Sequence, residues 1–267
     1  MSGSSRKTSL RLLISGFSTV LLIFLAGCMM PQKESPKAAT YEGPPTSIGQ
    51  GSARSFVTLD ADGKPSTIGI RLSKSALDGL PAEEPTDAIE WEYTLQLPPE
   101  AASSGYNHIG IDWNPHGHIP KGIYDKPHFD FHFYLIDDAA RNKITAVGDD
   151  LAQAHKAPPA EFMPAGYVLP PGTEVPHMGA HAVDPKADEF TGKPFTKTFI
   201  YGYYGGKMIF LEPMVTKAFL ETKPDALVTV AVPKKYSLHG YYPTQYGVKY
   251  DQAHGEYVIS LANLVPH

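Results

Sequence analysis

The most regular alternation of apolar and polar positions lies between residues 88 and 97. Ile89, Trp91, Tyr93, Leu95 and Leu97 alternate there with Glu90, Glu92, Thr94 and Gln96. Successive side chains of a strand point to opposite faces, so the segment is predicted to be a strand with one buried and one solvated face. On this interpretation Glu90 and Glu92 are solvated residues rather than a catalytic pair.

A second alternation runs through residues 128–137. Phe129, Phe131 and Phe133 share one face of the predicted strand, while His128, Asp130, His132 and Tyr134 share the other. An apolar face backed by a polar face is typical of a strand that forms the floor of a pocket. The segment 107–138 holds five of the eleven histidines, so we expect the functional site to be here.

The remaining pattern predicts more strands than helices. A hairpin is expected over residues 56–72, and a second over 196–215, where Gly205-Gly206 supplies a type I′ turn. Further strands are expected at 108–113, 226–232 and 256–264, and short helices at 73–80, 137–145 and 215–222. With 25 prolines and 24 glycines, the fold class is predicted as α+β and strand-rich, mainly antiparallel sheet with a few short helices and long Pro/Gly loops.

Glu212 stands out in the second hairpin. It shares a predicted strand face with Met208 and Phe210. A carboxylate buried on such a face is costly without a partner, so Glu212 is expected to meet a cation or a hydrogen-bond donor.

The first 27 residues have the pattern of a signal peptide. Arg6, Lys7 and Arg11 precede an apolar run from Leu12 to Leu25, and Leu-Ala-Gly then leads into Cys28. This resembles a lipoprotein lipobox and predicts lipidation of Cys28. The alternative, a transmembrane anchor, fits less well because the apolar run is short for a span of ~20 residues.

The predicted organisation is a leader at 1–27, the lipidated cysteine with a flexible tether at 28–52, and one globular domain at 53–267. The tether is rich in Pro, Ser, Gly and Lys. Membrane anchoring in the cell envelope follows. Met29, in place of Asp after the cysteine, favours the outer membrane by resemblance to lipoprotein sorting rules. Cys28 is the one cysteine, so lipidation leaves no thiolate for a disulfide, a metal or a nucleophile.

Charge restricts the partners. Removal of three basic and no acidic residues with the leader moves the net charge from −5 to −8. An acidic chain without Lys/Arg clusters is not expected to bind nucleic acid or a membrane surface, so the lipid is the predicted membrane contact.

Three segments carry a family resemblance: WNPHGHIPKGIYDKPHFDFHFY (113–134), VPHMGAHAVD (175–184) and YGYYGGKMIFLEPMVTKAFL (201–220). Together they resemble a domain-of-unknown-function family of secreted bacterial proteins, whose structural prototype comes from a thermophile and assembles as a ring-shaped homo-oligomer. The resemblance implies a strand-rich α+β fold and a possible homo-oligomer. It implies no reaction.

The candidate chemistry is a divalent-metal site. The candidate ligands are His118, His128, His132, His181 and Glu212. Imidazoles and carboxylates suit Zn, Mn, Fe, Ni or Cu. Residues four apart on a strand are separated by ~13 Å, so His128 and His132 are not expected to share an ion. Asp130, between them, is predicted to orient an imidazole.

Two interpretations of these residues stay open at this stage. They form either a metal site, loosely similar to that of cupins, or a hydrogen-bonded network without metal. The matching functions are a binding or structural envelope lipoprotein, and a metal-dependent enzyme with Glu212 or Asp130 as general base. No G-x-S-x-G, P-loop, H-E-x-x-H or dinucleotide motif is present. Neither a reaction nor a small-molecule ligand follows from the residues.

Overall fold

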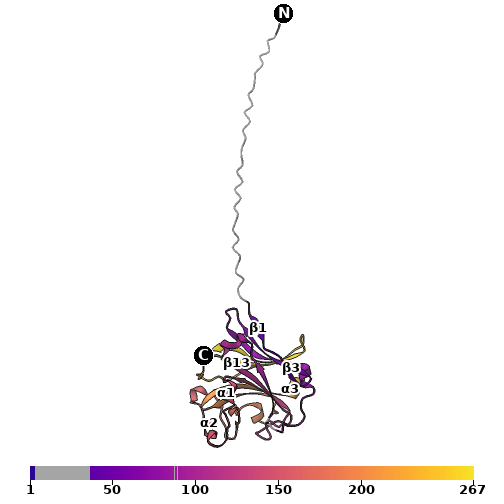
Figure 1. Cartoon of the computed structure of the whole chain (residues 1–267). Helices are drawn as coiled ribbons and strands as arrows, with labels where there is room; N and C mark the ends of the chain where they lie inside the picture. Colours follow the sequence, from indigo (N-terminus) through magenta and orange to yellow (C-terminus); the bar gives the residue numbers. More distant parts are fainter. Residues whose placement is uncertain (4–36, 87, 89) are drawn as a thin grey trace. The chain divides into compact units, whose positions relative to one another are not determined.

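The computed structural model describes residues 1–3, 37–86, 88 and 90–267 (Figure 1). The strands belong to one unit, Pro36–His267. The fold is α+β, rich in antiparallel strand with a few short helices, which confirms the predicted class. Residues 4–27 of the predicted leader, Cys28 and Ile89 lie outside the described residues.

The described strands form two seven-stranded antiparallel sheets. Sheet A has the order β1-β3-β4-β14-β13-β12, with β2 beside β3. Its strands are β1 (Ala39–Glu42), β2 (Thr46–Ile48), β3 (Gly51–Leu59), β4 (Pro65–Ser73), β12 (Asp225–Thr229), β13 (Tyr241–Asp251) and β14 (Glu256–Pro266). The predicted hairpin at 56–72 is β3–β4, and the strand β13 was not predicted.

Sheet B has the order β5-β6-β7-β11-β10-β9-β8. Its strands are β5 (Trp91–Gln96), β6 (His108–Asn114), β7 (His128–Tyr134), β8 (Glu174–Val175), β9 (Gly179–Ala182), β10 (Lys197–Tyr204) and β11 (Lys207–Thr216). The predicted hairpin at 196–215 is β10–β11, and both turn glycines have the positive φ that a type I′ turn needs.

The helices are single turns that join strands. They are α1 (Asp138–Arg141), α2 (Leu151–Ala154) and α3 (Lys217–Glu221), with 3-10 turns at Lys74–Leu77, Pro99–Ser104, Gly148–Asp150, Ala160–Phe162 and Asp188–Phe190. Side-chain caps begin two of them, since Asp137 accepts from Ala140 N and Thr216 from Phe219 N. Among the described residues no helix is long and apolar enough to cross a membrane.

The main core lies between the two sheets. Sheet B contributes the phenylalanine face of β7, together with Ile109 and Ile111 of β6. Sheet A contributes alternate residues such as Ile70 of β4 and Ile259 of β14. Burial of the three phenylalanines fixes which face of β7 points inward. His128, Asp130 and His132 therefore lie on the other face of sheet B.

That outer face of sheet B is also covered. One apolar cluster packs Tyr124 and Phe195 of the loops onto Ile200 and Met214 of the sheet. Another packs Ile144 and Met178 onto Tyr134 and Phe210. Loops between the strands thus close over the polar face, which explains why its histidines and carboxylates are buried rather than solvated.

A bulge changes the predicted face of Met208. Gly202 pairs with Phe210, but Tyr203 pairs with Met208, so Ile209 is an extra residue on β11. An extra residue shifts the alternation by one. Met208 consequently packs in the core between the sheets, whereas Phe210 and Glu212 stay on the outer face. The expectation that Met208 shares a face with Glu212 is wrong.

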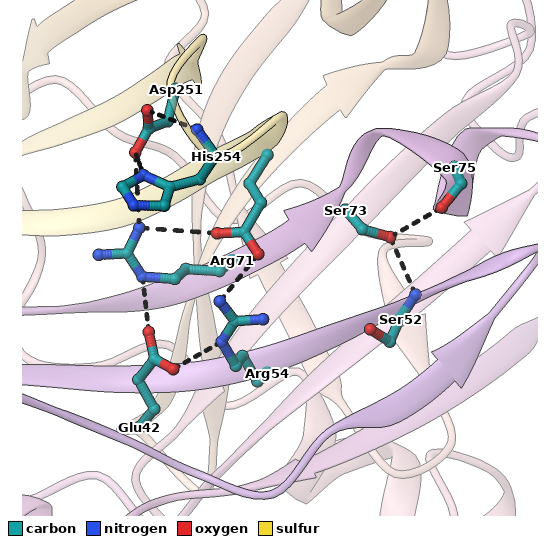
Figure 2. A network of polar contacts seen from close by, with 9 residues as sticks. Glu42, Ser52, Arg54, Arg71, Ser73, Ser75, Asp251 and His254 are labelled. Carbon is teal, nitrogen blue, oxygen red and sulfur yellow. Dashed lines mark hydrogen bonds and ion pairs between the residues drawn. The ribbon is translucent and has the colours of Figure 1, made fainter.

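The folded unit begins earlier than residue 53. Strands β1 and β2 lie inside the segment 28–52 that was predicted to be a flexible tether. Glu42 of β1 holds two arginines: Arg54 Nε donates to it at 2.7 Å, and Arg71 Nε forms an ion pair at 2.9 Å (Figure 2). Pairing with β3 and this ion-pair network attach β1 to the sheet, so the tether prediction is wrong from Ala39 onward.

Truncation of the central core phenylalanine should destabilise the fold. Phe131 is fully buried between the sheets, so Phe131→Ala leaves a cavity and is expected to lower the free energy of unfolding by ~3–5 kcal/mol. Leu227→Ala, at a half-exposed position on β12, is the control, with an expected loss of ~0.5 kcal/mol. Urea unfolding followed by tryptophan fluorescence measures both. Equal losses would contradict the assignment of Phe131 to the core.

Candidate metal centre

Strand pairing brings the candidate residues together across sheet B. Asp112 of β6 pairs with Asp130 of β7, and Asp130 pairs with Met214 of β11. Continuing the same register along β11 places Glu212 opposite His132. His181 of β9 enters from the far side of β10, where it pairs with Gly202. Residues from four strands therefore meet on one covered face.

His132, His181 and Glu212 form the first cluster. One ligand atom from each lies within 4.8 Å of the others. His132 Nε2 is 3.6 Å from Glu212 Oε1, and His181 Nε2 is 3.8 Å from Glu212 Oε2. These gaps exceed a hydrogen bond. Two atoms that each bind one tetrahedral metal at ~2.1 Å lie ~3.4 Å apart, so the spacing fits a shared ion better than direct contact.

The other ring nitrogen of each histidine faces an acceptor. His181 Nδ1 is 2.7 Å from the carbonyl oxygen of Thr173, so this nitrogen carries the hydrogen and donates it. His132 Nδ1 is 2.7 Å from Asp112 Oδ2, although the alignment of the two atoms is not that of a hydrogen bond. A neutral ring with hydrogen on Nδ1 keeps its lone pair on Nε2, the atom turned to Glu212. Acceptors behind the ligand nitrogens are the usual outer shell of a histidine metal site.

His118, His128 and Asp130 form the second cluster. Their ligand atoms also lie within 4.8 Å of one another. Each Nε2 is 3.1 Å from a different oxygen of Asp130, His118 from Oδ2 and His128 from Oδ1. Asn114 Nδ2 donates to Oδ2 at 2.8 Å and holds the carboxylate in place.

The structure divides the five predicted ligands between these clusters. His128 and His132 fall in different ones, as their separation along β7 requires. Asp130 contacts His118 and His128, whereas the carboxylate against His132 is that of Asp112. The sequence reasoning missed Asp112. The alternation of β6 carried the signal, because it puts His108, Gly110 and Asp112 on one face.

Burial shifts the charges of the first cluster. It lowers the pKa of His132 and that of His181 to about 4, so both rings are neutral at pH 7. Burial, followed by the charges of Asp130, Glu90 and Asp112, raises the pKa of Glu212 well above its usual range. A cation beside Glu212 would offset this cost.

The second cluster carries charge. Burial disfavours the ionised form of Asp130, but the imidazoles of His128 and His118 outweigh it and hold the pKa of Asp130 well below its usual range. Burial likewise opposes the charged form of His118. The charge of Asp130 and a hydrogen bond to it prevail, and they raise the pKa of His118 to about 9.

Both clusters open onto one cavity of about 570 Å³. Its walls are mainly apolar and include Ile119, Pro120, Pro170, Val175, Phe190 and Ile200. Glu90 also lines it, half-buried, and burial raises the pKa of Glu90 well above its usual range. The interpretation of Glu90 as a solvated residue is wrong. Glu92 instead forms an ion pair with the buried Arg141.

The ring of Phe210 packs against both histidines of the first cluster. Its ring meets His132 edge-on at 4.7 Å between centroids and lies 5.3 Å from the ring of His181. The ring occupies the space over Gly202, where a Cβ would overlap it. Gly202 is therefore needed for close approach, and it lets one aromatic ring position two candidate ligands.

Comparison with known proteins adds a family likeness over part of the chain. Residues 60–113 match the model of the TTHB210-like family, described as "Hypothetical protein TTHB210". This is consistent with the expected resemblance to an uncharacterised family with a thermophile prototype. The match ends at Trp113, so it includes none of the six residues of the two clusters. Searches of curated proteins and of solved structures found no match. The ring assembly and secretion stay predictions.

Filling the space above Gly202 should disturb the site. Gly202→Ala forces Phe210 to move and is expected to lower the free energy of unfolding by ~1–3 kcal/mol. Gly110→Ala on the same face is the control, since its nearest neighbour, a ring carbon of Tyr134, is 3.3 Å from the new Cβ. Urea unfolding compares the two, and a smaller loss for Gly202→Ala than for Gly110→Ala would count against the packing described.

Proposed function

We propose that the protein binds one divalent transition-metal ion, with Zn²⁺ as the reference ion, through His132, His181 and Glu212. The observation that carries the proposal is the pair of nitrogen–oxygen gaps of 3.6 and 3.8 Å between buried side chains. These gaps are too long for a hydrogen bond and close to the spacing of ligands around one ion.

Unpaired polar atoms support this proposal. Within the described part of the chain, His132 Nε2 and Glu212 Oε2 are buried and have no hydrogen-bond partner. Buried polar atoms are almost always satisfied, and a bound cation would satisfy both. Neutral imidazole and carboxylate ligands match the preference of zinc and its neighbours.

The role we infer is ligand binding on the metal. Three protein ligands leave at least one coordination position free in a tetrahedral ion, as in zinc sites that exchange a bound group. The cavity next to the cluster is of the size that holds a small molecule, and apolar walls with few polar groups are typical of ligand sites. The metal would fix one polar group of the ligand.

A metal-dependent enzyme is the second candidate, favoured by Glu90. A bound Zn²⁺ would supply Lewis acidity. Glu90 lines the same cavity and is not a member of either cluster, so its carboxyl group is free to accept or donate a proton. Burial and the charges of Asp112 and Asp130 raise the pKa of Glu90, and enzymes raise the pKa of acid–base carboxyl groups in the same way. Glu90 is therefore a better candidate for the general base than Glu212 or Asp130, which are assigned to the two clusters.

We also propose that Cys28 carries a lipid that anchors the protein in the cell envelope. The support is the sequence Leu-Ala-Gly-Cys after an apolar run of signal-peptide length. Cys28→Ala should leave the precursor uncleaved or mislocalised, because no thiol remains to accept the lipid. Membrane fractionation and gel mobility measure this, with Ser35→Ala as control. Normal processing of Cys28→Ala would contradict the proposal.

Metal binding is tested on protein stripped by a chelator and titrated with Zn²⁺ in a calorimeter. Glu212→Gln and His181→Ala each remove a ligand. Both are expected to weaken binding at the first cluster by more than ~100-fold, since losing an outer-shell partner alone costs ~10–100-fold.

His254→Ala is the matched control, because His254 is exposed in the β13–β14 turn of the other sheet. It should bind Zn²⁺ like the unchanged protein. Circular dichroism checks that each variant is folded. Undiminished binding by folded Glu212→Gln, or no binding by the unchanged protein, would exclude the proposed site.

A further inference from the structure

We propose that His118, His128 and Asp130 hold a second divalent cation, separate from the one at the first cluster. This goes beyond the proposed function, which needs one ion. The second cluster lies beside the first cluster on the same face of sheet B. Its members His118 and Asp130 line the cavity that the first cluster also lines. The ligands would be two imidazole nitrogens and a carboxylate, a set that suits zinc and similar ions.

His128 carries the argument. Its Nδ1 is 2.6 Å from the carbonyl oxygen of Lys126, so Nδ1 holds the hydrogen and the neutral ring keeps a lone pair on Nε2. That Nε2 is 3.1 Å from Asp130 Oδ1. Both atoms are buried, and among the described residues neither has a hydrogen-bond partner. Two lone pairs so placed repel, and a cation that contacts both would remove the repulsion.

His118 completes the set from a loop. Its Nδ1 is 2.6 Å from the carbonyl oxygen of Ile119, so its Nε2 is likewise the nitrogen available to a metal. The same Nε2 now donates a hydrogen bond to Asp130 Oδ2 at 3.1 Å, so a metal ion would displace that proton when it binds. Its side chain is 30% exposed, whereas His128 and Asp130 are buried. An ion would therefore arrive through the cavity and meet His118 first.

The carboxylate of Asp130 is oriented so that one of its oxygens can bind a metal ion. The amide of Asn114 donates to Oδ2, which leaves Oδ1 as the oxygen without a hydrogen bond. A fixed carboxylate with one free oxygen is what an outer-shell amide provides in metal sites. Asn114 and His128 pair across β6 and β7, so the sheet itself sets this geometry.

The two ions would occupy separate sites. Asp130 and His132 are two residues apart on β7, which puts their Cα atoms ~6.6–6.8 Å apart, and strand side chains stand nearly perpendicular to the sheet. Metal pairs that share ligands are ~3.5–4 Å apart. No residue belongs to both clusters. Each site should therefore fill and be lost independently of the other.

Stoichiometry tests the proposal. Chelator-stripped full chain is titrated with Zn²⁺ by calorimetry, and bound zinc is then measured by elemental analysis after gel filtration. We expect two ions per chain in the unchanged protein and one in His118→Ala. Glu212→Gln should also retain one. His118 is chosen because it is partly exposed on a loop, so its removal leaves the buried strand residues in place.

His116→Ala is the matched control. His116 is two residues away in the same loop, its side chain is 61% exposed, and it lies outside both clusters, so it should keep two ions. One ion in the unchanged protein, lost in Glu212→Gln and unaffected in His118→Ala, would overturn the second site and keep the first. Two ions in His118→Ala, or loss of an ion in His116→Ala, would overturn the second site as well. No bound zinc in any variant would overturn both proposals.

Discussion

The register of β7 is the constraint on which the site depends. Phe129, Phe131 and Phe133 are buried between the sheets, and a slip of one residue would turn them outward and the polar residues inward. The hydrophobic core thereby decides that His128, Asp130 and His132 lie on the outer face of sheet B, where Asp130 and His132 line the cavity. Hydrogen-bonded neighbours on both sides, β6 and β11, then bring Asp112 and Glu212 to fixed positions beside them. The alternation of side chains along β7 therefore sets both the packing of the core and the geometry of the site.

Covering the polar face gives these residues their unusual chemistry. Solvated histidines and carboxylates on a sheet would need no partners. Here the clusters around Tyr124 and around Met178 seal both ends of the face, so the ionisable groups between them lose their water. The pKa of Glu212 is raised by burial and by nearby carboxylates, whereas the pKa of Asp130 is lowered because its carboxylate lies between the imidazoles of His128 and His118. The face combines a cluster of neutral imidazoles around Glu212 with one in which His118 forms an ion pair with Asp130.

Local alternation predicted what depends on local order. It identified β5, β6, β7 and the β10–β11 hairpin, and it put His132 on a polar face and Glu212 on the face of Phe210. Pairing between distant segments was beyond it: Asp112 contacts His132 only because β6 lies beside β7, and β1 exists only because it pairs with β3. The sequence did not predict the bulge at Ile209, because simple alternation places Met208 and Phe210 on the same strand face. Composition misassigned residues 39–52 because the prolines and glycines of this segment lie beside the short strands β1 and β2, which contain none.

The position of His181 has a kinetic consequence. His132 and Glu212 come from central strands, but His181 comes from β9, a four-residue strand that is followed at the sheet edge only by the two-residue β8. Edge segments open by local fluctuation far more easily than central strands. An ion at the first cluster would therefore leave through brief detachment of β9, with two ligands still in place. Its residence time would be set by the edge of sheet B and not by the stability of the whole fold.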